Sequence, residues 1–119
     1  MTVHGDGQQT RCFTYIADTV AGTLLAGEAL GALGEAFNIG STRETSILGL
    51  AKTIKRLTRS KSPIEFVPYA SYYGEGFEDT RRRVPSVDKA KRLLGFSPKV
   101  DLETGLKKTI AWCRTHFTH

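Results

Sequence analysis

Short stretches of hydrophobic residues alternate with polar segments along the 119-residue chain, a pattern typical of an α/β fold with brief strands. Two extended segments are predicted at Met1–Val3 and Gln9–Ile16, joined by a tight turn at His4–Gly7. The Asp-Gly pair favours that turn because both residues tolerate positive φ angles. Further strands are predicted at Glu35–Ile39 and Ile64–Val67.

Apolar residues at helical spacing predict about four helices. The residues expected to cap or start them, in chain order, are Asp18, then Thr45 or Ser46, then Ser86, then Asp101. The first helix is expected to run to about Leu30 and to direct Val20, Leu24 and Leu25 towards the core. Gly95 is expected to end the third helix. These elements predict one small α/β domain over residues 1–119.

The segment Pro68–Pro85 shows neither helical nor strand periodicity, and its length favours a functional loop. It combines Phe77 with the run Arg81-Arg82-Arg83. A guanidinium can bind two phosphate oxygens and an aromatic ring can stack on a base, so Phe77 and Arg83 are candidates for holding a nucleotide. The alternative is a solvated charge run beside a few core tyrosines. Arg11 lies within a predicted strand, either facing a cleft or solvent.

The net charge of +5 and the pI of about 9.4 favour anionic partners, among them nucleic acid and phosphorylated metabolites. No apolar run approaches the roughly 20 residues of a membrane span, so no membrane role is expected. The N-terminal residues lack the basic and apolar regions of a signal peptide, which makes the cytoplasm the default location.

Self-sufficient catalytic motifs are absent from the sequence. No lysine follows a tyrosine by four residues, and no GxSxG, HExxH or GxxxxGK[ST] motif occurs. Gly31 and Gly34 follow a predicted helix and precede a predicted strand, the reverse of the order in a dinucleotide-binding turn. The two cysteines and three histidines are too scattered for a metal site; they are Cys12, Cys113, His4, His116 and His119.

Three blocks of the sequence resemble extended short-chain dehydrogenases/reductases of the NAD-dependent epimerase/dehydratase family. They are GDGQQTRCFTYIADTVAG at 5–22, EAFNIGSTRETSILGLAKTIKRLT at 35–58, and RRRVPSVDKAKRLLGFSPKVDLETGLKKTIAWCR at 81–114. The blocks occur in the family's order and spacing. Within the family, ASYYGEGFEDTRRRVPS is most similar to UDP-glucuronate decarboxylases.

The resemblance implies roles for four residues in binding a nucleotide-sugar. Arg11 would bind near phosphate, and Phe77 would take the place of a tyrosine that stacks on uracil. Arg83 matches an arginine that contacts substrate and is the proposed proton donor in a decarboxylase, so its catalytic role holds only if the parent enzyme is one. Asn38 matches an Asn-x-Gly residue near the substrate cleft.

The same resemblance implies that residues 1–119 form the C-terminal, nucleotide-sugar-binding part of such an enzyme, without a complete Rossmann sheet. The NAD-binding domain and its catalytic tyrosine and lysine are not in the sequence, so this chain is expected to hold no cofactor, although an intact relative would use NAD. We therefore expect a catalytically incomplete lobe that binds a UDP-sugar or similar ligand.

Strands without their usual partners favour a homo-oligomer, or association with a missing N-terminal half. Two functions of other classes stay open from the residues alone. One is a basic module that binds nucleic acid, which is the less favoured partner. The other is an assembly domain that pairs through exposed strands.

Overall fold

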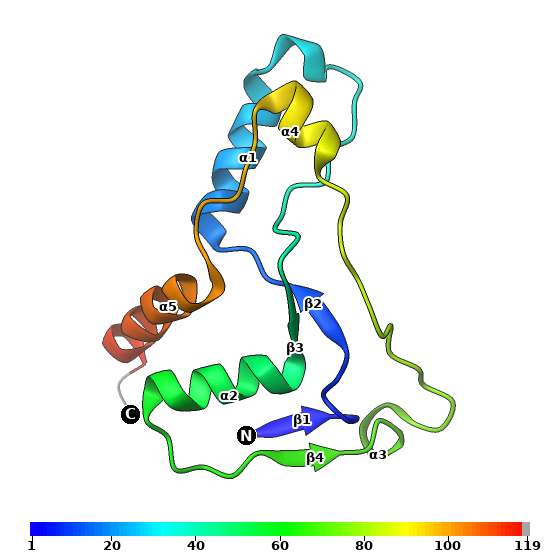
Figure 1. Ribbon diagram of the computed structural model, residues 1–119, viewed down its shortest axis with the longest axis vertical. Helices are drawn as coiled ribbons and strands as arrows, with labels where there is room; N and C mark the ends of the chain where they lie inside the picture. Colours follow the sequence, from blue (N-terminus) through cyan, green and yellow to red (C-terminus); the bar gives the residue numbers. More distant parts are fainter. Residues whose placement is uncertain (118–119) are drawn as a thin grey trace. The chain divides into compact units, whose positions relative to one another are not determined.

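The computed structural model describes residues 1–117, so His119 lies outside the described residues. In this part of the chain the secondary structure follows the order β1 (Thr2–His4), β2 (Thr10–Cys12), α1 (Ile16–Glu28), a 3-10 helix (Leu30–Ala32), β3 (Glu44–Ser46), α2 (Ile47–Thr58), β4 (Glu65–Val67), α3 (Ala70–Tyr73), α4 (Asp88–Leu94) and α5 (Leu102–His116) (Figure 1). The α/β class and the short strands are confirmed. The predicted number of helices was too low, because α3 and the 3-10 helix form in segments that lack a full helical period.

The described residues divide into two compact units. Unit 1 contains Met1–Arg11 and Glu44–Arg83, and unit 2 contains Cys12–Arg43 and the residues from Val84 onward. Each unit is therefore built from two segments that are far apart in the sequence. No helix within residues 1–117 is long and apolar enough to cross a membrane.

In unit 1, β1 pairs in parallel with β4, in the register Val3 opposite Phe66 (Figure 1). Val3 is 1% exposed, beneath α2. Helix α2 begins where the Ser46 hydroxyl accepts a hydrogen bond from the Gly49 N–H at 3.0 Å, as predicted for this cap. A parallel pair with a connecting helix is the arrangement expected of an α/β chain.

Strand β2 pairs with β3, and Thr10 also forms a parallel bridge with Arg82. The predicted turn after β1 is present, with positive φ at Gly5 and Gly7. The predicted strand Gln9–Ile16 was too long, since only Thr10–Cys12 is a strand. The ladder ends there because the chain turns into α1 at Ile16.

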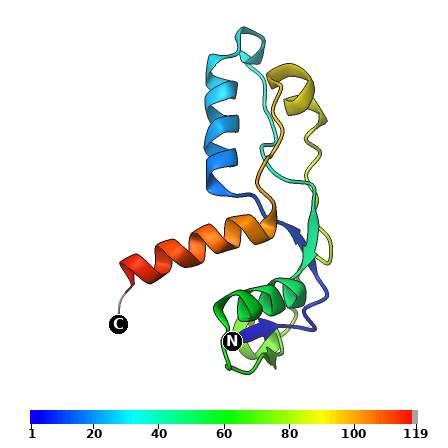
Figure 2. The ribbon, with the colours of Figure 1, turned by 60° about the vertical axis from the view of Figure 1, so that its left-hand side comes forward.

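The core of unit 2 is a small apolar cluster beneath α1 and α4, which lie side by side in Figures 1 and 2. Its buried members are Ala32, Ala90, Leu94 and Phe96. Gly95 ends α4 in the left-handed conformation, as predicted. Asp101 caps α5, as predicted, by accepting a hydrogen bond from the Thr104 N–H at 3.0 Å. The predicted start of α4 at Ser86 was two residues early.

Asp18 does not cap α1, contrary to the prediction. The helix begins at Ile16, with Tyr15 in the cap position, and Asp18 is buried in the first turn. Its carboxylate accepts hydrogen bonds from the backbone N–H groups of Lys99 and Val100 at 3.1 and 2.9 Å. Asp18 thus fixes the segment before α5 to the start of α1.

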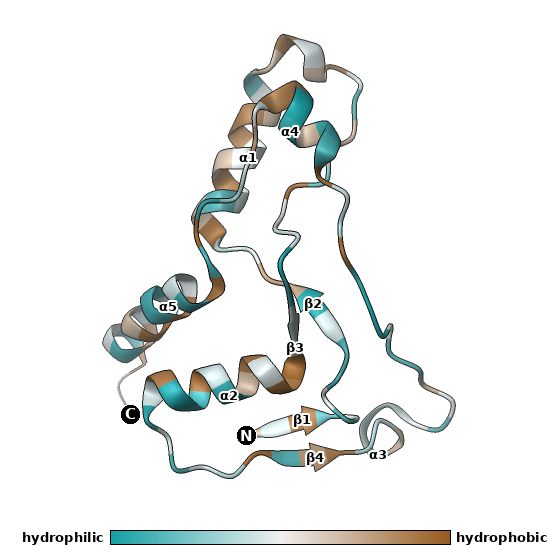
Figure 3. Ribbon diagram, in the orientation of Figure 1, coloured by the Kyte–Doolittle hydropathy of each residue, from teal (hydrophilic) through white to brown (hydrophobic). Residues whose placement is uncertain are grey.

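The predicted inner face of α1 was also wrong. The three predicted core residues Val20, Leu24 and Leu25 are 50%, 58% and 38% exposed. Gly22 is buried instead. Figure 3 shows hydrophobic residues along most of α1, whereas α2 alternates between hydrophobic and hydrophilic positions. A helix that is apolar all round gives no sequence signal for which face is buried.

Glu35–Ile39 does not form the predicted strand. Phe37 and Ile39 instead pack against the core cluster of unit 2. The segment is short, apolar and followed by Gly40, as a strand often is, but a strand also needs a ladder partner. Among residues 1–117 this segment has none.

Candidate functional site

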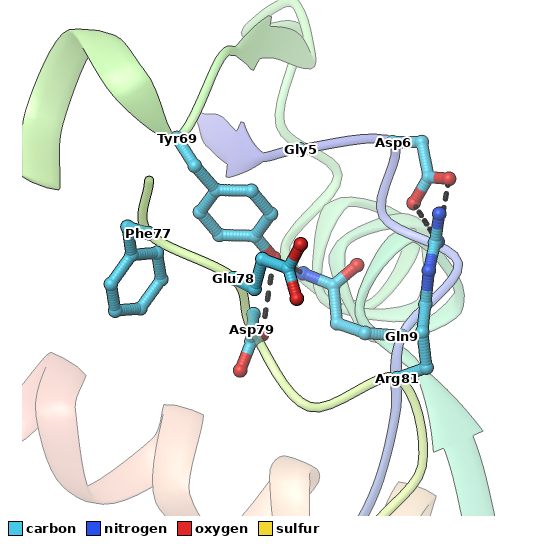
Figure 4. A pocket seen from close by; sticks show the side chains of 8 residues that line it. All are labelled: Gly5, Asp6, Gln9, Tyr69, Phe77, Glu78, Asp79 and Arg81. Atoms are coloured by element: carbon cyan, nitrogen blue, oxygen red, sulfur yellow. Dashed lines mark hydrogen bonds and ion pairs between the residues drawn. The ribbon is translucent and has the colours of Figure 1, made fainter. Parts of the chain in front are cut away.

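Unit 1 contains an open pocket of about 420 Å³ where the segment after β1 meets the segment after β4 (Figure 4). Its lining residues are Gly5, Asp6, Gln9, Tyr69, Phe77, Glu78, Asp79 and Arg81. Two aromatic rings, three carboxylates, an amide and a guanidinium therefore meet in one place. This mixture suits a polar ligand that also carries a flat ring.

Tyr69 lies at the centre of this pocket and joins its polar and aromatic parts (Figure 4). The Gln9 amide donates a hydrogen bond to the Tyr69 hydroxyl at 2.6 Å, and that hydroxyl donates to Asp79 Oδ2 at 3.0 Å. Burial, together with the hydrogen bond to the Asp79 carboxylate, raises the pKa of Tyr69. Tyr69 therefore stays protonated, and able to donate, across the neutral range.

Arg11, predicted from the sequence as an anion-binding residue, is held by the loop that carries Phe77. Its guanidinium donates to Asp79 Oδ1 at 2.6 Å and to the carbonyl oxygens of Thr80 and Thr10 at 2.7 and 2.8 Å. These bonds use three of the five guanidinium N–H groups. The side chain is thus fixed in direction and partly neutralised.

The neighbouring arginines are paired as well. Arg81 forms an ion pair with Asp6 at 2.7 Å, and Arg82 forms one with Glu44 at 2.7 Å. The hydrogen bond from Arg81 lowers the pKa of Asp6, and the bonds from Arg82 and then Thr10 lower that of Glu44. Two of the three arginines in the predicted basic run are therefore paired with carboxylates.

Phe77 belongs to a cluster of rings that spans the start of unit 1 and the segment after β4. Its ring stacks on Tyr73 with 4.4 Å between centroids and lies 5.5 Å from the Tyr69 ring. The side chain is 44% exposed, so part of the ring faces solvent at the pocket. Phe77 is placed where it can offer an aromatic surface to a ligand.

The other two predicted residues have different surroundings. Arg83 ends the second segment of unit 1 and is exposed, and within residues 1–117 its side chain makes no hydrogen bond or ion pair. Asn38 belongs to unit 2, where its amide donates to the Ser86 carbonyl at 3.0 Å. Phe77 thus lines the Tyr69 pocket, and Arg11 is connected to it through Asp79. Asn38 makes a local contact within unit 2.

Sequence reasoning missed the groups that hold Arg11, Arg81 and Arg82. They are the carboxylates Asp79, Asp6 and Glu44, together with Tyr69 and Gln9, which hold Asp79 in turn. One signal was present, because acidic residues precede the arginine run in GFEDTRRR. The partners Asp6 and Glu44 are 75 and 38 positions away from their arginines, and no local pattern identifies them.

The residues present do not fit a dinucleotide cofactor. A phosphate-binding turn lies between a strand and the start of a helix. Gly31 lies instead in the 3-10 helix that follows α1, and irregular backbone comes after Gly34. Within residues 1–117, no group of three or more His, Cys, Asp or Glu side chains is placed to hold a metal ion.

The sequence matches both a family model and individual relatives of the same kind. Residues 1–109 match the family described as GDP-mannose 4,6 dehydratase. The chain is 46% identical over 114 residues to a UDP-N-acetyl-α-D-glucosaminuronate decarboxylase of Bacillus cytotoxicus, covering 96% of this chain and 35% of that protein. It is 40% identical to UDP-glucuronic acid decarboxylase 1 of Danio rerio, covering 100% of this chain and 27% of that protein.

Solved structures agree with these sequence matches. An epimerase of Methanothermobacter thermautotrophicus superposes with a TM-score of 0.85 at 32% identity, covering 96% of this chain and 32% of that one. A UDP-glucuronic acid 4-epimerase of Bacillus cereus, in complex with UDP-glucuronic acid and NAD, superposes with a TM-score of 0.84 at 30% identity, covering 98% and 35%. The chain therefore spans about a third or less of the length of these relatives.

Proposed function

The chain belongs to the GDP-mannose 4,6 dehydratase family, and we propose that it is the C-terminal, nucleotide-sugar-binding lobe of an NAD-dependent epimerase, dehydratase or decarboxylase. The observation that carries the proposal is the pocket of unit 1, where the exposed part of Phe77 lies beside the network that holds Arg11. Two of the relatives are named as decarboxylases of UDP-sugars, which supports a UDP-sugar as the ligand.

In this proposal each residue has a separate role. Phe77 stacks on the base, and the two guanidinium N–H groups of Arg11 that remain unpaired attract the diphosphate. Arg83, exposed and unpaired among the described residues, contacts the sugar carboxylate or a phosphate. Arg83 would also donate a proton only if the parent reaction is a decarboxylation. Asn38 belongs to unit 2 and stays a prediction from the family resemblance alone.

The proposed lobe is catalytically incomplete alone. Its residues bind and orient the ligand, while the NAD of an intact relative would supply the hydride chemistry from another part of the assembly. The sequence offers no tyrosine followed four residues later by lysine, so the proton transfer of that step also lies outside these residues.

An NMR titration of the chain tests this proposal, with UDP as ligand and an inorganic polyphosphate of equal charge as the control. Saturable shifts around Phe77 and Arg11 with UDP alone are the expected result. Arg83→Ala should weaken binding of a UDP-sugar. The control is Arg92→Ala, which replaces an exposed arginine on α4 and should leave the binding unchanged. Equal responses to UDP and polyphosphate would remove the evidence for base recognition.

The same titration bears on the nucleic-acid alternative. That alternative rests on the net charge of +5 and on a basic cluster that is separate in the sequence from the paired arginines: Lys55, Arg56, Arg59 and Lys61. A polyanion-binding module would respond to polyphosphate as strongly as to UDP, and its affinity would fall steeply with salt.

The exposed apolar face of α1 supports a partner for unit 2. Ile16, Val20 and Leu24 recur every four residues and would lie on one side of the helix, opposite buried Gly22. A second copy of this chain, or the rest of an extended dehydrogenase fold, would cover them. Mass measurement by light scattering separates the two: a dimer that Val20→Glu dissociates supports the second copy, and a monomer contradicts it.

A further inference from the structure

Tyr69 is a pocket side chain that contacts Phe77 directly and is connected to Arg11 through Asp79. Its ring lies 5.5 Å from the ring of Phe77, the proposed base platform. Its hydroxyl binds Asp79 Oδ2, and Asp79 Oδ1 in turn binds Arg11, the proposed phosphate ligand. One side chain thus joins the ring site to the anion site through two contacts.

The position of Tyr69 is itself fixed by unit 1. It follows Pro68 directly after β4, and its ring packs against Gly5, where even a methyl group would come within 2.4 Å of Cε2. The amide of Gln9 holds its hydroxyl at 2.6 Å, and Gln9 is only 5% exposed. Gln9 Nε2 also donates to the His4 carbonyl at 3.1 Å, which ties the amide to β1. Tyr69 therefore has little freedom to move.

Asp79 makes the coupling selective. Its carboxylate neutralises much of the Arg11 charge, so a free phosphate gains little from Arg11 alone. A free nucleoside likewise gains only the partly covered ring of Phe77. A ligand that carries a base and a diphosphate at the correct spacing gains both contacts. It loses translational entropy only once, whereas two separate ligands would each lose it.

We propose that Tyr69 is a positioning residue that sets the spacing between Phe77 and Arg11 and thereby selects nucleoside diphosphates over nucleosides or phosphates alone. The inference rests on the proposed function, and it adds the residue that makes the two subsites act together. Tyr69 touches neither the reacting atoms nor the phosphate in this role. It acts through Asp79 and through the ring of Phe77.

The test compares three ligands on Tyr69→Phe, which keeps the ring beside Phe77 and removes only the hydroxyl. The dissociation constant for UDP should rise about tenfold, because the hydrogen bond that fixes Asp79 is lost. The constants for uridine and for inorganic pyrophosphate should change less than about twofold, since each uses one subsite. NMR titration at equal protein concentration measures all three. Tyr72→Phe, an exposed tyrosine beside the same cluster, is the matched control.

Two results would overturn the inference. Equal weakening of UDP, uridine and pyrophosphate would indicate that the hydroxyl only supports the fold, and an unchanged UDP affinity would indicate no role at all. Failure of the proposed function looks different, because the unmodified chain would then bind UDP no better than pyrophosphate. Tyr69→Phe spectra that retain the α2 signals exclude unfolding as a cause.

Discussion

The ring of Phe96 lies against the backbone of Gly22, so closely that a methyl group at position 22 would come within 2.8 Å of the ring. The same methyl group would approach Ile39 Cγ2 at 2.5 Å. Gly22 is thus the contact point at which α1 packs on the core of unit 2. The helix tolerates a glycine there because only a bare backbone leaves room for the ring.

Replacing Gly22 by alanine should therefore destabilise the chain although alanine favours helices. We expect a loss of roughly 1–3 kcal/mol in the free energy of unfolding, the usual effect of overpacking a core. Gly27→Ala is the control on the same helix, since nothing lies within 4 Å of its added methyl group. That change should stabilise by roughly 0.5–1 kcal/mol. Urea unfolding followed by circular dichroism measures both, and a gain in stability for both would contradict the packing.

Gly5→Ala should displace Tyr69 from its network. Gly5 and Gly76 both have positive φ, so alanine at either costs roughly 1–2 kcal/mol of backbone strain. Only at Gly5 does the new methyl group also meet Tyr69, while at Gly76 nothing lies within 4 Å. We expect the larger loss of stability, and loss of UDP binding, for Gly5→Ala alone. Equal effects of the two variants on UDP binding would contradict the contact.

Tyr69 should titrate at a higher pH than an ordinary tyrosine. Burial and the hydrogen bond to Asp79 raise the pKa of Tyr69 above the ordinary value of about 10. The contribution of the protonated Tyr69 phenol to the free energy of unfolding is complete below the ordinary tyrosine pKa. It is lost as the pH rises through the raised pKa of Tyr69. Ultraviolet absorbance of the phenolate should show a late step that is absent in Tyr69→Phe. Asp79→Asn should shift this step only partly, because the burial remains.

Ser46→Ala should weaken the start of α2. The serine hydroxyl accepts the Gly49 N–H at 3.0 Å, and loss of such a cap costs roughly 0.5–2 kcal/mol. Ser46→Asp keeps an acceptor at the same place and should restore most of the stability. Urea unfolding of the unmodified chain, Ser46→Ala and Ser46→Asp measures the free energy of unfolding of each. Equal values for the alanine and aspartate variants would contradict a role for the cap.

Local signals in the sequence predicted local structure well. Ser46, Asp101 and Gly95 end or begin helices as predicted, because caps depend on neighbouring backbone groups. The superfamily resemblance is also confirmed, since the family match extends over residues 1–109. Those motifs act through residue type and spacing, which a sequence states directly.

Features that depend on distant partners were predicted less well. Asp18 was assigned to a cap, but its partners are 81 and 82 positions away. Glu35–Ile39 is short, apolar and followed by Gly40, as a strand often is, but it has no ladder partner in residues 1–117. In the candidate site the sequence indicated the ring of Phe77 and the charge of Arg11. It could not indicate that Tyr69 and Gln9 connect them, because such a network exists only after the chain has folded.

The division of the chain has a consequence for the order of folding. Unit 1 and unit 2 alternate along the sequence, with changes after Arg11, Arg43 and Arg83. Unit 1 is complete when residue 83 leaves the ribosome, but the Asp18 contact to Val100 must wait for a later part of the chain. Helix α1, with its exposed apolar residues, is therefore synthesised long before its packing partner Phe96. During that interval the exposed apolar residues of α1 lack the Phe96 contact, and such transiently uncovered surface favours aggregation of a partly folded chain.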